Sequence, residues 1–302
     1  MNFVIVSPRQ KWGGAIVLHS LCKNLNEMGY DASIFYTEIY GIGNKPLISK
    51  IKYIIKWLQY SIHDYFDERN EKYYKPIKGQ KRKFLPFVNS NTIVIYPDTV
   101  YGNPLGAKKV VRWFLFHNRY INDSNAYGKY DLFICYRKQF NDWKLNPKGY
   151  ELHTPYFDLD LYRRTNYGER HGTCYIIRKG KHREDLPKSF DGPIIDDMSE
   201  ERKVEIFNEC EKCISYDTQT AYSGIAAMCG CLSIVVPEKG KQRSDYLSNG
   251  EFGYGRAYGF DKEEITFAKQ TSHLVEESYR NSNKKGKESV DQFIKLCEEY
   301  FG

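Results

Sequence analysis

Short apolar runs alternate along the first half of the chain with segments that have helical spacing. The runs cover residues 3–7, 31–36, 92–98, 110–117 and 131–136. Strands that are buried on both faces of a parallel sheet give continuous apolar runs of this kind. Residues 15–29 between the first two runs have apolar side chains at helical spacing and end at Gly29, a favourable helix C-cap. The alternation predicts a doubly wound α/β domain.

The second half repeats this pattern after a stretch without periodicity at residues 152–164. Strands are predicted at 173–178, 193–197, 213–217 and 232–238, and helices at 200–212, 220–230 and 287–301. We therefore predict two Rossmann-like domains that face each other across a cleft, residues 1–157 and 158–302. We expect the last helix to pack back on the first domain.

Composition adds limits on the kind of protein. The 302 residues include 41% hydrophobic side chains, which is enough for two cores, and the net charge of +7 points to an acidic partner. The opening segment MNFVIVSPRQ has no basic residues before its apolar run, and no apolar stretch reaches about 18 residues. These features predict a cytoplasmic protein without a secretion signal or a membrane span.

The eight cysteines lie mostly in apolar runs, as expected for reduced, buried thiols. Cys210 with Cys213 and Cys229 with Cys231 have spacings compatible with zinc. No histidine is near either pair, and Cys213 and Cys231 begin predicted strands. We therefore predict no metal site.

Positive charge is concentrated in residues 45–83, whose excess of seven basic residues equals that of the whole chain. Part of this stretch predicts an amphipathic helix. Its apolar face consists of Leu47, Ile51, Ile54, Ile55, Leu58 and Ile62. Lysines occupy another face, with Tyr53, Trp57 and Tyr60 between them. The pattern predicts that the protein attaches peripherally to the anionic inner face of the membrane. The alternative is that the apolar face of the helix packs on the sheet.

Ligands bind at the carboxyl ends of the strands in open α/β sheets, so the residues after each strand are candidates. The strand at 173–178 leads into Arg178, Lys179, Gly180, Lys181 and His182. Cations neutralise phosphates, and a glycine lets backbone approach them, so this loop is a candidate diphosphate clamp. A solvated charged loop is the alternative.

A run of polar residues follows the strand at 213–217. It contains Asp217, Thr218, Gln219, Thr220, Tyr222 and Ser223 and opens a helix of small residues. Phosphate or ribose can bind at such a helix start. The alternative is an N-cap at Asp217 or Thr220, which explains one residue of the run.

The predicted first domain contributes two further candidates. Gly13 and Gly14 precede a helix and suit half of a phosphate-binding turn, or equally a tight turn. His117, Asn118 and Arg119 follow the strand at 110–117, where a histidine can bind a sugar hydroxyl or act as a base. A structural role for His117 is the alternative.

The stretch from Cys213 to Gly240 resembles the donor-binding segment of bacterial GT-B glycosyltransferases. Residues 226–231, followed by LSIVVP, match the end of the family's helix–strand motif. Gly13–Gly14 matches its N-terminal glycine loop, and Arg178 with Lys181 or Lys179 matches its phosphate-binding pair. The resemblance implies transfer of a sugar from a nucleotide-diphosphate sugar to a glycan or lipid-linked acceptor, in bacterial surface polysaccharide synthesis. The nucleotide sugar is a substrate, and no cofactor is expected.

One feature of the family is missing. Retaining members carry two glutamates at the positions of Asp217 and Ile225, and isoleucine cannot bind a ribose. The resemblance then leaves ribose binding to Thr220, Tyr222 or Ser223 and leaves the anomeric outcome open. Asp158 and Asp160 lie in the predicted linker and do not form a metal-binding D-x-D motif. A metal-independent, hexosyltransferase-like enzyme is therefore expected.

Two other classes remain open. One is a different two-domain Rossmann enzyme, such as a nucleotide-sugar epimerase or an oxidoreductase, although the G-x-G-x-x-G fingerprint is absent. The other is a basic nucleic-acid-binding protein, although the sequence contains no known nucleic-acid-binding module. We predict no nucleic-acid partner.

Overall fold

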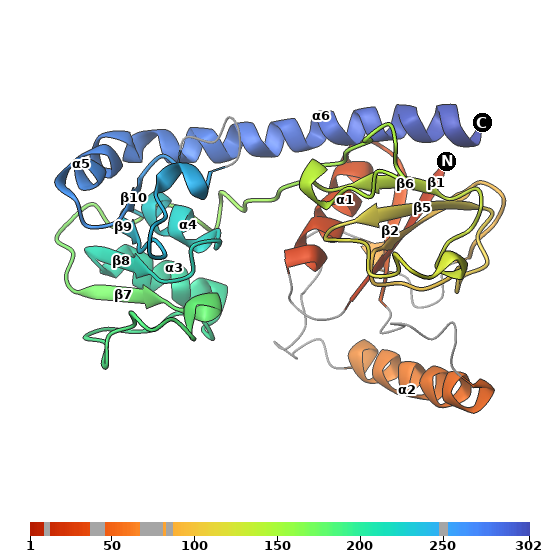
Figure 1. Cartoon of the computed structure of the whole chain (residues 1–302), viewed down its shortest axis with the longest axis horizontal. Helices are drawn as coiled ribbons and strands as arrows, with labels where there is room; N and C mark the ends of the chain where they lie inside the picture. The colour runs from red at the N-terminus through yellow and green to blue at the C-terminus, as the bar shows by residue number, and fades with distance from the viewer. Residues whose placement is uncertain (9–12, 37–45, 67–80, 83–86, 248–252) are drawn as a thin grey trace. The chain divides into compact units, whose positions relative to one another are not determined.

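The computed structural model describes residues 1–8, 13–36, 46–66, 81–82, 87–247 and 253–302 (Figure 1). The chain forms two compact units. Unit 1 contains Met1–Tyr156 and Asn283–Gly302, and unit 2 contains Phe157–Ser282. Each unit is built on a parallel β-sheet, so the prediction of two parallel α/β sheets is confirmed.

The sheet of unit 1 has the strand order β3-β2-β1-β4-β5-β6. Its strands are β1 (Asn2–Ser7), β2 (Asp31–Tyr36), β3 (Lys81–Arg82), β4 (Thr92–Pro97), β5 (Lys109–Phe114) and β6 (Leu132–Cys135). The register sets Val4 of β1 beside Ser33 of β2 and Val94 of β4. The strand order reverses between β1 and β4, and ligands of doubly wound sheets bind at such a switch point.

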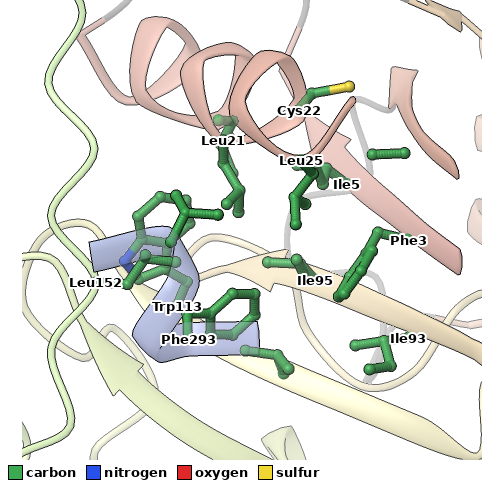
Figure 2. Packing of buried hydrophobic residues seen from close by; sticks show 14 of the residues in the cluster. Phe3, Ile5, Leu21, Cys22, Leu25, Ile93, Ile95, Trp113, Leu152 and Phe293 are labelled. Atoms are coloured by element: carbon green, nitrogen blue, oxygen red, sulfur yellow. The ribbon is translucent and has the colours of Figure 1, made fainter. Parts of the chain in front are cut away.

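Helices cover the core of unit 1. On one face, α1 (Gly13–Glu27) and the later turns of α6 (Val275–Phe301) pack on β1, β4 and β5. Figure 2 shows Leu21, Leu25 and Phe293 pointing into this core. The central strands are largely apolar because their other face is also buried, in a second cluster that includes Val4 and Val94. α6 is longer than the helix predicted at 287–301, and it begins within unit 2.

The sheet of unit 2 has the strand order β10-β9-β8-β7, so its strands follow one another in chain order. They are β7 (Thr173–Ile176), β8 (Lys212–Ser215), β9 (Leu232–Val235) and β10 (Arg256–Tyr258). Helices α3 (Glu200–Glu209) and α4 (Tyr222–Met228) share a core with β7 and β8. Helix α5 (Lys262–Thr271) packs with β9 and β10 in another cluster.

The predicted strand at residues 193–197 is wrong. Ile194 forms one isolated parallel bridge to Tyr175, and the segment otherwise has no strand pairing. The apolar pair Ile194–Ile195 resembled a strand, but Ile195 is buried as a core residue next to a turn. Five short 3₁₀ helices complete the described structure: η1 (Ser124–Ala126), η2 (Lys138–Phe140), η3 (Arg178–Gly180), η4 (Arg243–Asp245) and η5 (Ser272–Leu274).

The predicted amphipathic helix is present as α2 (Leu47–Phe66). Five side chains of the predicted apolar face are exposed, so packing of these residues on the sheet is not observed: Leu47, Ile51, Ile55, Leu58 and Ile62. The predictions for the side chains of Tyr53, Ile54, Trp57 and Tyr60 lie outside what the structure describes. Among the helices in the described ranges, none combines the length and the apolar character that a bilayer crossing requires.

Candidate functional site

The loops after three neighbouring strands of unit 2 are joined by one arginine. Arg183 Nη1 donates hydrogen bonds to the carbonyl oxygens of Tyr216, after β8, and Val236, after β9, at 3.3 and 2.7 Å. Its Nη2 donates to the carbonyl oxygen of Pro237 at 2.8 Å. The loop after β7, which carries Arg183, is thereby fixed to the carboxyl ends of β8 and β9.

Gly180 lets the loops after β7 and β8 approach each other at backbone distance. A Cβ atom at Gly180 would lie 2.2 Å from the carbonyl oxygen of Tyr216, much closer than real Cβ contacts allow. A glycine is therefore needed because of close approach rather than because of an unusual dihedral angle. The basic loop and the polar run are held side by side at this position.

Asp217 is the first residue of the polar run and has an unsatisfied oxygen. Its side chain is 2% exposed, and its Oδ1 accepts a hydrogen bond from the Gln219 N–H at 3.0 Å. Its Oδ2 is buried, and none of the described residues donates a hydrogen bond to it. A buried polar atom that lacks a partner typically costs about 1–3 kcal/mol, and more when it is charged. The unmet oxygen at a strand end is therefore a candidate for contact with a ligand.

The basic loop beside Asp217 presents uncompensated positive charge. Arg178, Lys179, Lys181 and His182 are exposed, and within the described ranges none of their side chains forms an ion pair. The backbone of this loop is fixed because Asp196 Oδ2 accepts hydrogen bonds from the N–H groups of Ile177 and Arg178, at 3.1 and 2.7 Å. A fixed backbone with several cations at a strand end suits a phosphate ligand.

The hydroxyl groups of the polar run make mostly internal contacts. Thr220 Oγ1 accepts the N–H of Tyr222 at 3.2 Å, and Ser223 Oγ donates to the carbonyl oxygen of Thr220 at 3.2 Å. The N-cap of α4 is Ala221, so neither Asp217 nor Thr220 is the cap. Hydrogen bonds within local turns therefore account for Thr220 and Ser223, which are more residues than a single N-cap would explain. Thr218 is half-buried, and its side chain makes no hydrogen bond to another described residue.

The Tyr222 hydroxyl belongs to a network between α3 and α4. It donates to Glu200 Oε1 at 2.8 Å, and Lys203 Nζ lies 3.3 Å from it. Glu200 Oε2 accepts a second hydrogen bond, from the Tyr162 hydroxyl, at 2.6 Å. Burial, then the Glu200 charge, holds the pKa of Tyr222 well above its usual range. This hydroxyl is therefore occupied within the unit.

In unit 1, Gly14 and Arg119 come together around an aspartate that the sequence analysis did not single out. Asp98 directly follows β4 and is 5% exposed. Its Oδ1 accepts the N–H of Leu115 at 3.1 Å, and its Oδ2 lies 3.4 Å from Arg119 Nε. A Cβ on Gly14 would contact Leu115 Cδ1 at 3.3 Å. These residues surround the carboxyl end of β4, at the switch point of the sheet.

Burial raises the pKa of Asp98 above its ordinary value, and the Leu115 N–H and the Arg119 charge offset part of this rise. A carboxylate whose pKa has been raised accepts a proton more readily. Asp98 is accordingly a candidate general base. Its sequence signal was its position as the acidic residue after an apolar run.

His117 and Gly13 lie in the same unit without a contact to Asp98 that would give them a defined role. The His117 ring is exposed and packs against Phe116 and Phe140, with centroid distances of 4.6 and 5.4 Å. Gly13 begins α1, and nothing lies within 4 Å of the Cβ that it lacks. The segment before it, residues 9–12, lies outside the described residues.

The cysteines and the pair Asp158 and Asp160 lie where burial and a local turn account for them. All eight thiols are buried and unpaired by disulfides, and burial raises the pKa of Cys229 to about 12. Among the residues described, no three or more His, Cys, Asp or Glu side chains are grouped so that they could hold a metal ion. Asp158 Oδ1 accepts the N–H groups of Asp160 and Leu161, at 3.2 and 3.1 Å, which makes it a turn residue.

A cavity of about 610 Å³ in unit 2 contains none of the predicted site residues. Arg163, Arg164 and Arg280 line it together with Met228, at the end of α4. The polar run precedes α4, so the cavity lies at the opposite end of this helix. We place the candidate site by its chemistry at the strand ends rather than by cavity volume.

Comparison with known proteins gives structural similarity at low sequence identity. No family model and no curated protein matches the chain. The similar solved structures include the glycosyltransferase VinC in complex with dTDP, with 12% identity, 100% of this chain and 99% of that chain covered, and a TM-score of 0.33. The spinosyn forosaminyltransferase SpnP has 10% identity, covers 99% of both chains and has a TM-score of 0.39. MurG of Acinetobacter baumannii has 10% identity, 99% and 100% coverage, and a TM-score of 0.30.

Proposed function

We propose that the protein is a glycosyltransferase that moves a sugar from a nucleotide-diphosphate sugar to an acceptor hydroxyl. The observation that carries the proposal is the buried Oδ2 of Asp217, to which no described residue donates a hydrogen bond, beside exposed cations that form no ion pair with a described residue. Because Oδ2 is buried, a sugar hydroxyl can donate to it only when the residues that cover it move on binding, while the diphosphate binds the exposed cations. A simple anion would satisfy the cations but not the carboxyl oxygen.

In this proposal, the loop after β7 binds the leaving group. Arg178 and Lys181 neutralise the diphosphate, and Lys179 adds a third cation in the same loop. As the bond between the anomeric carbon and the diphosphate oxygen breaks, negative charge develops on that oxygen. Cations that are already in place stabilise this charge more than they stabilise the intact donor.

Thr218 has a side chain without a hydrogen bond and can bind phosphate or ribose, so we retain it as a donor contact. The hydroxyls of Thr220 and Ser223 are engaged in turns, and the Tyr222 hydroxyl is engaged with Glu200. For these three residues, a role in ribose binding requires sharing or exchanging the present contacts.

We assign acceptor recognition to unit 1. The acceptor oxygen forms the new bond to the anomeric carbon and loses its proton to a base. Asp98 is the stronger candidate for this base because it is buried at the switch point with a raised pKa, whereas His117 is exposed. Arg119 pairs with Asp98, and Gly13 and Gly14 begin the helix beside it.

The finer aspects of the proposal are a glycan or lipid-linked acceptor, transfer of a hexose, and a role in surface polysaccharide synthesis. We further propose that cationic side chains take the place of a metal ion at the diphosphate. This view is supported by Asp158, whose carboxylate is used by a turn, and by the cations of the loop after β7.

A thermal-shift panel tests the proposed function. We expect one of UDP, GDP, CDP or dTDP to raise the melting temperature, with the effect growing with concentration as mass action requires. NAD(P) and a single-stranded oligonucleotide serve as comparators. Stabilisation by NAD(P) would favour an oxidoreductase, stabilisation by the oligonucleotide would favour a nucleic-acid-binding protein, and either result would overturn the proposal.

A further inference from the structure

Helix α2 exposes a stripe of large apolar side chains. Six large apolar side chains are 38–72% exposed: Leu47, Ile48, Ile51, Ile55, Leu58 and Ile62. At about 100° per residue, these positions form one continuous stripe along the 20-residue helix. Isolated exposed apolar residues are common on protein surfaces, but a contiguous stripe of this kind marks an interaction surface.

Basic side chains flank this stripe. Lys52 and Lys56 are exposed on the same helix, on the side that follows Ile48 around the helix axis. The surrounding residues 45–83 contain the whole net positive charge of the chain. The surface therefore combines an apolar face with a positively charged border.

The combination discriminates between classes of partner. A nucleic acid would contact the lysines and leave the isoleucine stripe exposed to water. An anionic bilayer satisfies both features, because the apolar face enters the acyl boundary while lysines contact the headgroups. Since α2 is not apolar enough to span a bilayer, it would lie in the plane of the interface.

We propose that α2 docks the protein on membranes that contain anionic phospholipid, with Leu47, Ile51, Ile55, Leu58 and Ile62 inserted and Lys52 and Lys56 at the headgroups. This docking surface stands independently of the proposed function, because none of its residues belongs to the candidate site. If both proposals hold, the acceptor is presented at the same membrane.

Vesicle co-sedimentation of the full chain tests the proposal. Vesicles of phosphatidylcholine with phosphatidylglycerol are compared with vesicles of phosphatidylcholine alone, at low and high salt. We expect binding to the anionic vesicles that weakens at high salt, because the lysine contribution is screened. Negligible binding to the anionic vesicles at low salt would overturn the proposal.

Two variants separate the apolar and the charged contributions. Ile51→Glu with Ile55→Glu should abolish binding, and Lys52→Glu with Lys56→Glu should weaken it by roughly thirtyfold or more. The matched control is Lys108→Glu with Lys144→Glu, at exposed positions of the same unit, and it should bind like wild type. Each variant changes exposed side chains, and its melting temperature is checked beside wild type.

Other occupants of the stripe give different results. If the stripe instead binds a second copy of the chain, sedimentation velocity would show a dimer that the Ile51→Glu and Ile55→Glu variant does not form. A dimer without vesicle binding would contradict the proposal. The proposal also fails if the lysine variant loses binding to an oligonucleotide while vesicle binding is unchanged. A failed nucleotide panel leaves the vesicle result unaffected, so the two proposals fail separately.

Discussion

In each unit a buried aspartate follows a strand of the sheet. The two aspartates differ in the hydrogen bonds and ion pairs that their carboxylate oxygens form. Asp98 after β4 is bonded through Oδ1 to the Leu115 N–H and is paired through Oδ2 with Arg119. Asp217 after β8 accepts a hydrogen bond through Oδ1 from the Gln219 N–H, and its Oδ2 has no partner in the part of the chain that the structure describes. The cations differ in the same way: Arg119 is paired with Asp98, whereas Arg178, Lys179 and Lys181 form no ion pair with any residue in the described ranges.

The difference indicates in which unit the site residues lack hydrogen-bond and ion-pair partners among the described residues. The site in unit 1 is self-sufficient, so a ligand there must share existing contacts. The site in unit 2 has an unmet acceptor and several unmet cations, and a ligand with hydroxyl and phosphate groups would complete it. This contrast supports placing the donor on unit 2 and the acceptor on unit 1.

The largest expected effect comes from removing the unpaired cations. Arg178→Ala and Lys181→Ala should each lower the transfer rate by on the order of 10²–10³, since each removes charge stabilisation of the leaving diphosphate. Their melting temperatures should match wild type, because both side chains are exposed without ion pairs. Lys188→Ala, at an exposed position in the same segment, is the control. Full turnover in both well-folded variants would contradict the proposal that Arg178 and Lys181 bind the diphosphate.

The next effect concerns Asp98. Asp98→Asn should lower the transfer rate by about a hundredfold if this carboxylate is the base, with donor affinity unchanged. A matched control is Asp123→Asn, which alters a capping residue in the same unit. If Asp98→Asn keeps full activity while His117→Ala loses it, the base is His117.

The stability of Asp98→Asn has a predictable dependence on pH. Burial raises the folded-state pKa above the ordinary 3.8, so the stability associated with this group is fully present below 3.8 and is lost as pH rises through the folded-state value. Asparagine removes this loss and retains an acceptor for the Leu115 N–H. The melting temperature of the variant should equal or exceed that of wild type at pH 7, with the gap closing near pH 3. A large loss of stability at pH 7 would contradict this view.

A smaller effect is expected from Gly180→Ala, which forces apart the loops that carry Asp217 and the cations. The added methyl group would collide with the Tyr216 carbonyl, so we expect destabilisation of roughly 1–3 kcal/mol together with weaker nucleotide binding. Chemical denaturation and nucleotide titration measure the two effects. Gly172→Ala is an unsuitable control because its positive φ adds strain, whereas a Cβ at Gly168 of the same unit makes only an ordinary contact, so Gly168→Ala should be neutral.

Much of the fold could be predicted because it depends on local pattern. Strand β4 is buried on both faces, which makes it an apolar run, and in β5 the buried Arg112 interrupts such a run. The segment at 193–197 shows where this reasoning fails, since two adjacent isoleucines beside a turn resemble a strand. The early start of α6 was missed because its first turns are polar and are held by packing within unit 2.

The candidate site was less predictable because it depends on contacts between residues far apart in the chain. Arg183 bonds carbonyl groups after two other strands, and no sequence pattern distinguishes it from the exposed cations before it. The Tyr222 hydroxyl looked available, but its partner Glu200 lies on another helix. Asp217 was found because it follows a strand, yet its unmet oxygen is a property of the folded unit.

The most direct test of the account compares two ligands on two proteins by isothermal titration. Under the proposed function, wild type should bind the nucleotide sugar more tightly than the matching nucleoside diphosphate, because the proposal has a sugar hydroxyl donate to Asp217 Oδ2. Asp217→Asn retains an acceptor for the Gln219 N–H, so it should bind the diphosphate normally and lose about tenfold or more in affinity for the nucleotide sugar. Asp197→Asn, at an exposed position nearby, should behave as wild type. Equal affinity of wild type and Asp217→Asn for the nucleotide sugar would contradict the account.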